Sequence, residues 1–165
     1  MTRPDQAQAL LRNLTYELFQ TEVSASRHGR REARRQPGTA PADALLAIAA
    51  HADIALKELW ELARKHGLPR SSFGMLLGLT FSELRQRIAD HFIDAERSYR
   101  GTLLGMRHGA DLMRIFEATA ARAGRDELVR WARSWLARRD ALVKEAEREL
   151  VWYAAHARNA LTRAY

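Results

Sequence analysis

Apolar residues recur at three- and four-residue steps along almost the whole chain, the spacing that places them on one face of an α-helix. No stretch alternates apolar and polar residues in the way that predicts a strand. Glycine and proline mark breaks at residues 37–38, 67–69 and 124. The pattern predicts an all-α fold, an up-and-down bundle of four to five long helices, in one domain over residues 1–165. The expected helices cover about 4–34, 41–66, 72–98, 102–123 and 126–157.

The stretch over residues 71–123 is either one very long helix or two helices. Its apolar phase continues past Gly101, which favours one helix. However, Arg100-Gly101-Thr102 is typical of a C-cap glycine followed by an N-cap threonine, and each interior glycine costs about 1 kcal/mol relative to alanine. One long helix would also extend beyond the first two helices with its apolar face uncovered. We expect a break between Ser98 and Thr102, and we expect the Gly101, Gly105 and Gly109 spacing to let two helices approach closely.

Composition limits the class of protein. The chain has 165 residues, of which 47% are apolar and 28% are charged, so it is long enough for one globular domain with a sizeable core. It contains no cysteine, which excludes a disulfide scaffold, a thiolate metal site and a cysteine nucleophile. Its start has no apolar leader region, and no apolar run approaches the roughly 20 residues of a membrane span. We expect a cytoplasmic protein without a membrane partner.

The charge is strongly basic and unevenly placed. The net charge is +7, and only three of the 27 basic residues are lysine, leaving 24 arginines. Five arginines fall within nine residues near the end of the first predicted helix. Such a run can grip phosphates of a nucleic acid. It can also be the solvated C-terminal end of a helix, where the dipole favours cations, and this is the interpretation we prefer. The five residues are Arg27, Arg30, Arg31, Arg34 and Arg35.

One arginine falls in an apolar seam. Arg139 continues the helical series of Leu128, Ala132 and Trp135 on the last helix. A buried charge without a partner is costly, so Arg139 needs a carboxylate. If the last hairpin turns near residue 124, Arg139 faces the region of Asp111. The sequence therefore predicts a structural ion pair between Arg139 and Asp111, which fixes the register of the bundle.

The same register brings several imidazoles and carboxylates to one level of the bundle. Two His-x-x-Asp pairs contribute, and such groups hold iron, manganese or zinc in helical proteins. No Glu-x-x-His motif occurs, and a cationic Arg139 in the same layer would repel a dication. We therefore expect no cofactor, with iron, manganese or zinc as the alternative. The candidate ligands are His51, His91, Asp94, His108 and Asp111.

A family resemblance rests on the order of several short motifs. These are the Gly67-Leu68-Pro69 turn, the Ser71-Ser72-Phe73-Gly74 start of the third helix, the segment Met106-Arg107-His108-Gly109-Ala110-Asp111-Leu112, and Arg139-Asp140. Over residues 6–155 the layout resembles ferritin-like bundle domains. The resemblance implies metal ligands on the fourth and last helices. Here Arg139 replaces one of them with a positive charge, which implies that a metal function has been lost or changed.

No pattern marks a catalytic centre. There is no glycine-rich phosphate loop between a strand and a helix, and no nucleophile stands beside a base. We therefore expect a non-catalytic interaction or structural bundle with a polar core layer, whose partner is another protein or a second copy in a homodimer. The alternatives are a metal-binding ferritin-like protein and a nucleic-acid-binding module that uses the basic helix end.

Overall fold

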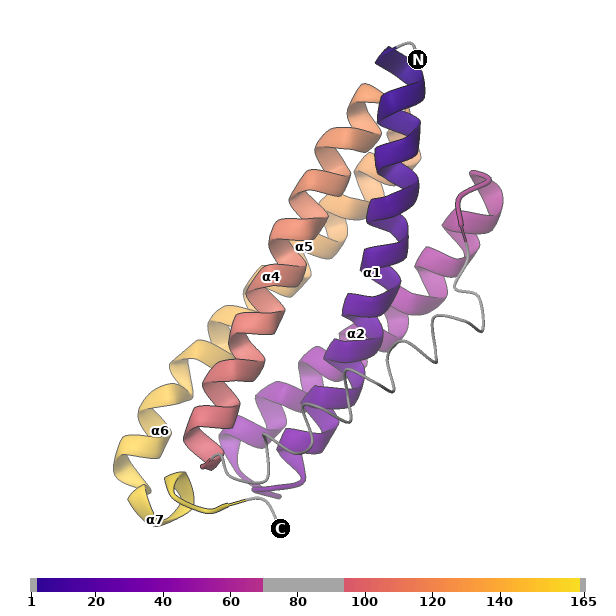
Figure 1. Ribbon diagram of the computed structural model, residues 1–165. Helices are drawn as coiled ribbons and strands as arrows, with labels where there is room; N and C mark the ends of the chain where they lie inside the picture. The colour runs from indigo at the N-terminus through magenta and orange to yellow at the C-terminus, as the bar shows by residue number, and fades with distance from the viewer. Residues whose placement is uncertain (1–2, 70–93, 164–165) are drawn as a thin grey trace.

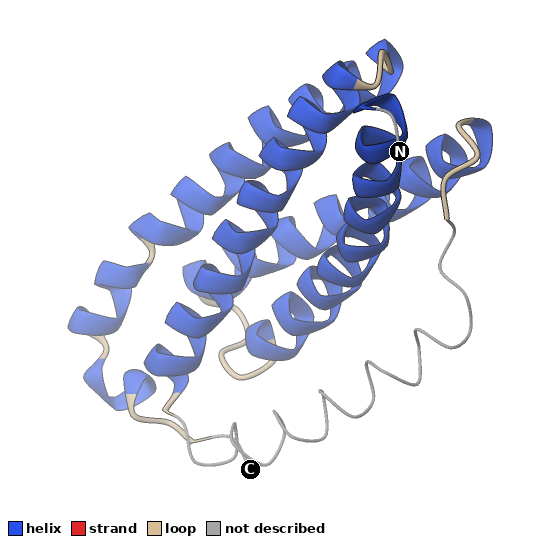
Figure 2. Ribbon diagram, turned by 45° about the horizontal axis from the view of Figure 1, so that its top comes forward, coloured by secondary structure: helices blue, strands red, loops and turns tan. Residues whose placement is uncertain are grey.

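The computed structural model describes residues 3–69 and 94–163, and this part of the chain is an all-α bundle (Figure 1). Short loops over residues 34–39 and 123–125 each join two long helices, as the colouring of Figure 2 shows. The long helices are α1 (Arg3–Ala33), α2 (Ala40–Lys65), α4 (Ala95–Arg122) and α5 (Asp126–Arg148). Two short helices follow, α6 (Leu150–Ala155) and α7 (Ala157–Ala160). The predicted helix over 72–98 falls largely outside the described residues.

Local signals in the sequence set the ends of α2. The Thr39 side chain accepts a hydrogen bond from the Ala42 amide at 3.4 Å, and Pro41 occupies the first turn, where its missing amide costs nothing. After the last turn, Gly67 adopts a φ of 63°, and the Leu68 amide bonds back to the Ala63 carbonyl at 2.9 Å. The helix thus ends at the predicted break over residues 67–69, and it does so through a left-handed glycine.

The helix α4 begins earlier than expected. The predicted break between Ser98 and Thr102 is wrong, because the helix starts at Ala95 and runs through Gly101 without interruption. The alternative of one helix over 71–123 also fails, because Asp94 is extended, with φ −62° and ψ 153°. The Ala95 amide bonds to the Thr162 carbonyl at 2.9 Å, so the end of the chain fixes this start. Burial of an apolar face from Tyr99 to Phe116 outweighs the glycine cost.

The apolar core formed by the described residues has two parts. One cluster joins Leu18 of α1, Leu59 of α2, Phe116 of α4 and Leu128 of α5. The other cluster is built from residues nearer the opposite end of the bundle, including Ala25, Ile48, Leu103, Val143 and Tyr153. On α1 and α5 a polar residue lies between the stretches that form the two clusters, and on α2 a polar residue lies at the end of the second cluster's stretch, next to Ala52. These residues are Glu22, His51 and Arg139, and all three are buried.

Small residues set how closely α1 approaches its neighbours. A Cβ built on Gly29 would lie 2.9 Å from the Leu45 carbonyl oxygen and 3.2 Å from the Ala49 Cβ of α2. A Cβ on Gly109 of α4 would lie 2.8 Å from Thr21 Cγ2 of α1. Gly109 therefore permits the close approach that the glycine spacing predicted. Gly101 and Gly105 do not share this role, since nothing lies within 4 Å of a Cβ at either position.

Candidate functional site

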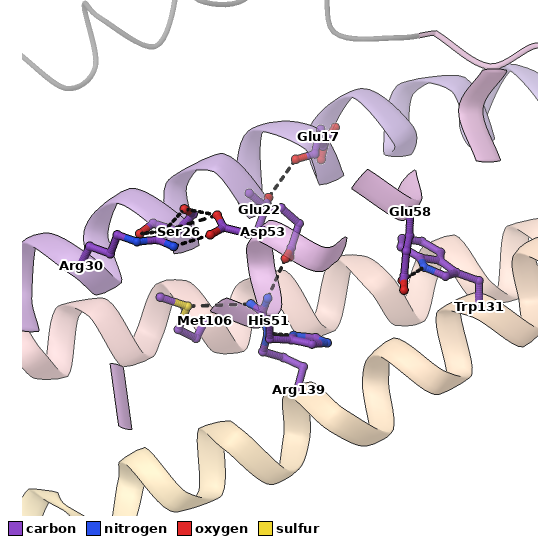
Figure 3. A network of polar contacts seen from close by, with 11 residues as sticks. Glu17, Glu22, Ser26, Arg30, His51, Asp53, Glu58, Met106, Trp131 and Arg139 are labelled. Atoms are coloured by element: carbon purple, nitrogen blue, oxygen red, sulfur yellow. Dashed lines mark hydrogen bonds and ion pairs between the residues drawn. The ribbon is translucent and has the colours of Figure 1, made fainter. Parts of the chain in front are cut away.

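Arg139 is the largest fully buried side chain among the described residues, with none of its surface exposed. Its position on α5 follows from the apolar series of that helix, which also buries Ala132, Trp135 and Val143. The guanidinium points between α1, α2 and α4 (Figure 3). The sequence therefore identified correctly that an arginine lies in the seam.

Each donor group of this guanidinium meets a different neighbour. Nη2 donates to Glu22 Oε2 at 2.6 Å, Nε donates to His51 Nδ1 at 3.1 Å, and Nη1 lies 3.9 Å from the Met106 sulfur. The guanidinium carbon also lies 4.5 Å from the centre of the Trp135 ring, within the range of a cation–π interaction. Arg139 thus links α5 to α1, α2 and α4 at one level of the bundle (Figure 3).

Burial and mutual attraction oppose each other in the electrostatics of the ion pair. Burial raises the pKa of Glu22, while the charge and the hydrogen bond of Arg139 lower it. Burial likewise lowers the pKa of Arg139, and Glu22 opposes that shift. Both carboxylate and guanidinium are fully enclosed, so each charge depends on the other for compensation. The pair is therefore costly to break from either side.

The tautomer of His51 follows from its partner. An arginine can only donate, so His51 Nδ1 accepts and the imidazole is neutral. Burial, followed by repulsion from Arg139 and Arg138, lowers the pKa of His51 to about 4. The ring also packs against Trp135, with ring centres 5.7 Å apart. Protonation would place a second cation against Arg139 in the core.

Two polar atoms in this layer have no hydrogen-bond partner among the described residues. They are Oε1 of Glu22 and Nε1 of Trp135, and both are buried. The Trp135 indole N–H lies close enough to lower the pKa of Glu22, but it falls short of hydrogen-bond geometry. The layer is therefore nearly, but not completely, satisfied.

The expected pairing of Arg139 with Asp111 is wrong. Asp111 lies on the outer face of α4 with its side chain 72% exposed, and it pairs with Arg114 at 2.9 Å. Asp140 pairs with the same Arg114. The neighbours Ala110 and Met113 occupy the inner face of α4, which turns Asp111 towards solvent. The position of the last hairpin turn predicts which levels of α4 and α5 face each other, but it does not determine which side of α4 faces inward.

The predicted metal ligands do not gather. Asp94 and Asp111 are separated by 17 residues along α4, or about 25 Å of helix. Asp94 lies 3.8 Å from Arg163, while His108 is exposed. His51 is occupied by Arg139, and His91 lies outside the described residues. Within residues 3–69 and 94–163 no three side chains of the ligand types form a group that could hold a metal ion.

The basic helix end is partly neutralised. Arg30 pairs with Asp53 of α2, and Ser26 donates to the same carboxylate at 2.6 Å (Figure 3). This contact lowers the pKa of Asp53. Glu32 lies between Arg31 at 3.5 Å and Arg35 at 3.0 Å. The remaining members of the run, Arg27 and Arg34, are exposed. Arg30, Arg31 and Arg35 thus form ion pairs with other described residues, and nucleic-acid binding by this run stays a prediction.

Glu22 is the functional residue that the sequence interpretation missed. It lies four residues after Leu18 and three before Ala25, both buried, so it shares the inner face of α1. The apolar residue beside it, Val23, is only half-buried. The sequence did contain a signal for this residue. Glu22 is a carboxylate at the three- and four-residue spacing of the buried apolar positions, and a buried arginine needs a carboxylate partner.

Comparison with known protein families, curated proteins and solved structures finds no match to this chain. The arrangement is that of a helical bundle and is compatible with a ferritin-like architecture. No helix in the described part of the chain has the length and apolar character needed to cross a membrane.

Proposed function

We propose that this protein is a non-catalytic helical-bundle module. Its Glu22–Arg139–His51 layer holds the long helices in register, and its outer surface binds another protein. The observation that carries the structural half of this proposal is the complete enclosure of the ion pair, with Glu22 and Arg139 both at 0% exposure. A catalytic group must reach a substrate, and both of these side chains are closed off from solvent.

The grooves on the described surface also support a structural role for the buried layer and a binding role for the outer surface. One runs between α1 and α4, one between α2 and α5, and one along α4 towards Leu150 of α6. Glu22, His51 and Arg139 line none of these three grooves. Buried polar groups of this kind fix one packing arrangement among several that an apolar core would allow, which is the role we assign to the layer.

We also propose a ferritin-like origin for the bundle, with the ion pair in place of a metal layer. The compatible architecture supports this, as does the cationic Arg139 at a level where the family resemblance implies a ligand. A guanidinium in direct contact with an imidazole disfavours a dication there, because the two positive charges repel.

Metal loading tests the structural role of the layer. The protein is purified without chelator, incubated in turn with Fe²⁺, Mn²⁺ and Zn²⁺, and desalted; bound metal per chain and the thermal midpoint are then measured. We expect no stoichiometric metal and no change in midpoint, because binding to the folded state alone would raise the midpoint. Stoichiometric metal that is lost in both His51→Ala and His108→Ala would contradict the proposal.

The outer face of α2 is the surface that we propose for a protein partner. Leu46 and Ile54 are 45% and 50% exposed, and Ala50 lies between them on the same face at four-residue steps. A photo-crosslinking residue at Ala50 should give a discrete adduct, either with a second copy or with another protein. The matched control is the same residue at Ala141, an exposed alanine of α5. Equal yields at both positions, or no adduct at either, would contradict this surface.

A further inference from the structure

A groove of about 380 Å³ runs between α1 and α4, apart from the buried ion pair. The two helices are antiparallel: Thr21 lies against Gly109, and further along the groove residues 28 and 31 of α1 accompany residues 97–102 of α4. The helices touch at Gly109. Beyond this contact Gly101 and Gly105 leave open space, because nothing lies within 4 Å of a Cβ at either position. The groove therefore results from glycines that do not pack.

The charged side chains that the described residues contribute to this groove are all basic. Among the residues that the structure describes, its lining contains Arg31, Arg97, His28 and His108, and no aspartate or glutamate. Arg31 is already held by Glu32 at 3.5 Å and by His28 at 2.8 Å. Arg97 is exposed and has no ion pair or hydrogen bond to any described residue. On the same helix, by contrast, Arg100 pairs with Glu96 and Arg107 with Glu147. Arg97 can therefore donate hydrogen bonds to an anion at the edge of the groove.

Three of the four hydroxyl groups contributed to the groove by the described residues make no hydrogen bond to a described residue; Thr21 is the exception. Thr15, Thr21 and Thr119 donate to the backbone carbonyl four residues earlier, the usual arrangement within a helix. Ser24, Ser98 and Thr102 line the groove and make no such bond within residues 3–69 and 94–163. Ser98 is the most telling, since it is only 9% exposed and still has no partner. The Ser98 hydroxyl is not one of the fully buried atoms that lack a partner, so it reaches solvent and can bind a ligand in place of water.

We propose that this groove binds a small organic anion. Its carboxylate or phosphate head lies between Arg97 and Arg31 and accepts hydrogen bonds from Ser98 and Thr102. Its apolar body lies over Gly101, Gly105 and the Ala25 and Met106 side chains. The volume falls within the range of small-molecule sites, and charge-assisted hydrogen bonds fix the orientation of the ligand. This binding site is independent of the structural role proposed for the buried layer.

Probes that share one ring and differ in charge test the proposal. Naphthoate, naphthyl phosphate and naphthylmethylammonium are titrated into the full-length protein by calorimetry, and backbone amide NMR shifts locate the site. We expect both anions to bind and to shift the amides of Gly101 and Gly105. We expect the cation to bind roughly tenfold or more weakly, because it loses charge-assisted contacts and meets Arg97. Absence of binding by every probe, or equal binding of the cation, would overturn the proposal.

Matched variants distinguish anion binding in the groove from nonspecific attraction to the positive charge of the protein. Arg97→Glu should lower the affinity for the anions roughly tenfold or more. Arg122→Glu alters the charge of the same helix equally, at an exposed position outside the groove, and should change nothing. Gly105→Leu places a side chain in the open space and should abolish binding, while circular dichroism shows an intact fold. An equal loss in Arg122→Glu would overturn the proposal.

A nucleic acid is the remaining source of anionic groups. A single-stranded oligonucleotide is titrated against the parent protein, Arg97→Glu and Arg34→Glu. If the oligonucleotide displaces naphthyl phosphate and Arg34→Glu removes binding while Arg97→Glu does not, the anion affinity belongs to the basic helix end, and the groove proposal fails. Naphthyl phosphate binding that depends on Arg97 but not on Arg34 supports the groove.

Discussion

The buried layer around Arg139 and the groove between α1 and α4 lie within about one helical turn of each other, yet they treat polar groups in opposite ways. In the layer, the guanidinium donors meet a carboxylate, an imidazole and a sulfur. In the groove, Ser98 and Thr102 have no partner among the described residues. Met106 belongs to both, since it contacts Arg139 and lines the groove. A fully enclosed charge needs a protein partner because water cannot reach it. In an open groove, water or a ligand can make the hydrogen bonds instead.

Breaking the buried pair should produce the largest effect. Arg139→Met leaves Glu22 buried without its partner, and we expect a loss of about 3–5 kcal/mol in the free energy of unfolding. Urea denaturation followed by circular dichroism measures it. The matched control is Arg114→Met, which removes an exposed arginine that pairs with Asp111 and Asp140; its cost should stay below about 1 kcal/mol.

The double variant Glu22→Leu/Arg139→Met sharpens this test. Removing both charges leaves no uncompensated ion in the core, so the double variant should recover most of the loss in Arg139→Met. A double variant as unstable as the sum of its two single variants would show that the two residues act separately, and it would refute the coupling on which the layer is built.

Acid should weaken the layer through His51. Its pKa is about 4 in the folded protein against an ordinary value of 6.5, so the unfolded chain binds the proton more readily between those two pH values. The stabilisation is complete above pH 6.5 and is lost as the pH falls towards 4, by about 3 kcal/mol in total. Glu22, with a raised pKa, works in the opposite direction, gaining stability as the pH falls.

The variant His51→Gln isolates the imidazole, because a glutamine oxygen can accept from Arg139 but does not titrate. The free energy of unfolding is measured in urea at a series of pH values for both proteins. The difference between them should shrink or reverse from pH 7 to pH 4, while the Glu22 contribution is common to both. Parallel pH profiles would show that His51 does not control the acid response.

Glycine substitutions should give the smallest effects and should have opposite signs at the α1–α2 contact and in the groove. Gly29→Ala forces a methyl group to within 2.9 Å of the Leu45 carbonyl oxygen, so it should cost about 1–3 kcal/mol despite the better helix propensity of alanine. Gly105→Ala meets nothing within 4 Å and should stabilise α4 by up to about 1 kcal/mol. Thermal midpoints measure both. A gain of stability in both variants would show that α1 and α2 can separate at little cost.

The sequence by itself determined the helical class, the ends of α2 and the burial of Arg139. Each of these depends on residues close together in the chain. The Thr39 cap, the Gly67 turn and the apolar spacing around Arg139 act within a turn or two of helix. Such local signals determine helix ends and buried faces independently of how distant segments of the chain pack.

Only the tertiary structure decided which carboxylate Arg139 binds and where α4 begins. Glu22 is 117 residues away in the chain, and Asp111, much nearer, faces solvent. A rotation of α4 by one residue position, about 100°, would change which side chains face inward, and no local pattern fixes that rotation to within one residue. The start of α4 likewise depends on Thr162, at the far end of the chain. Packing between distant segments therefore fixed both the partner of Arg139 and the first residue of α4.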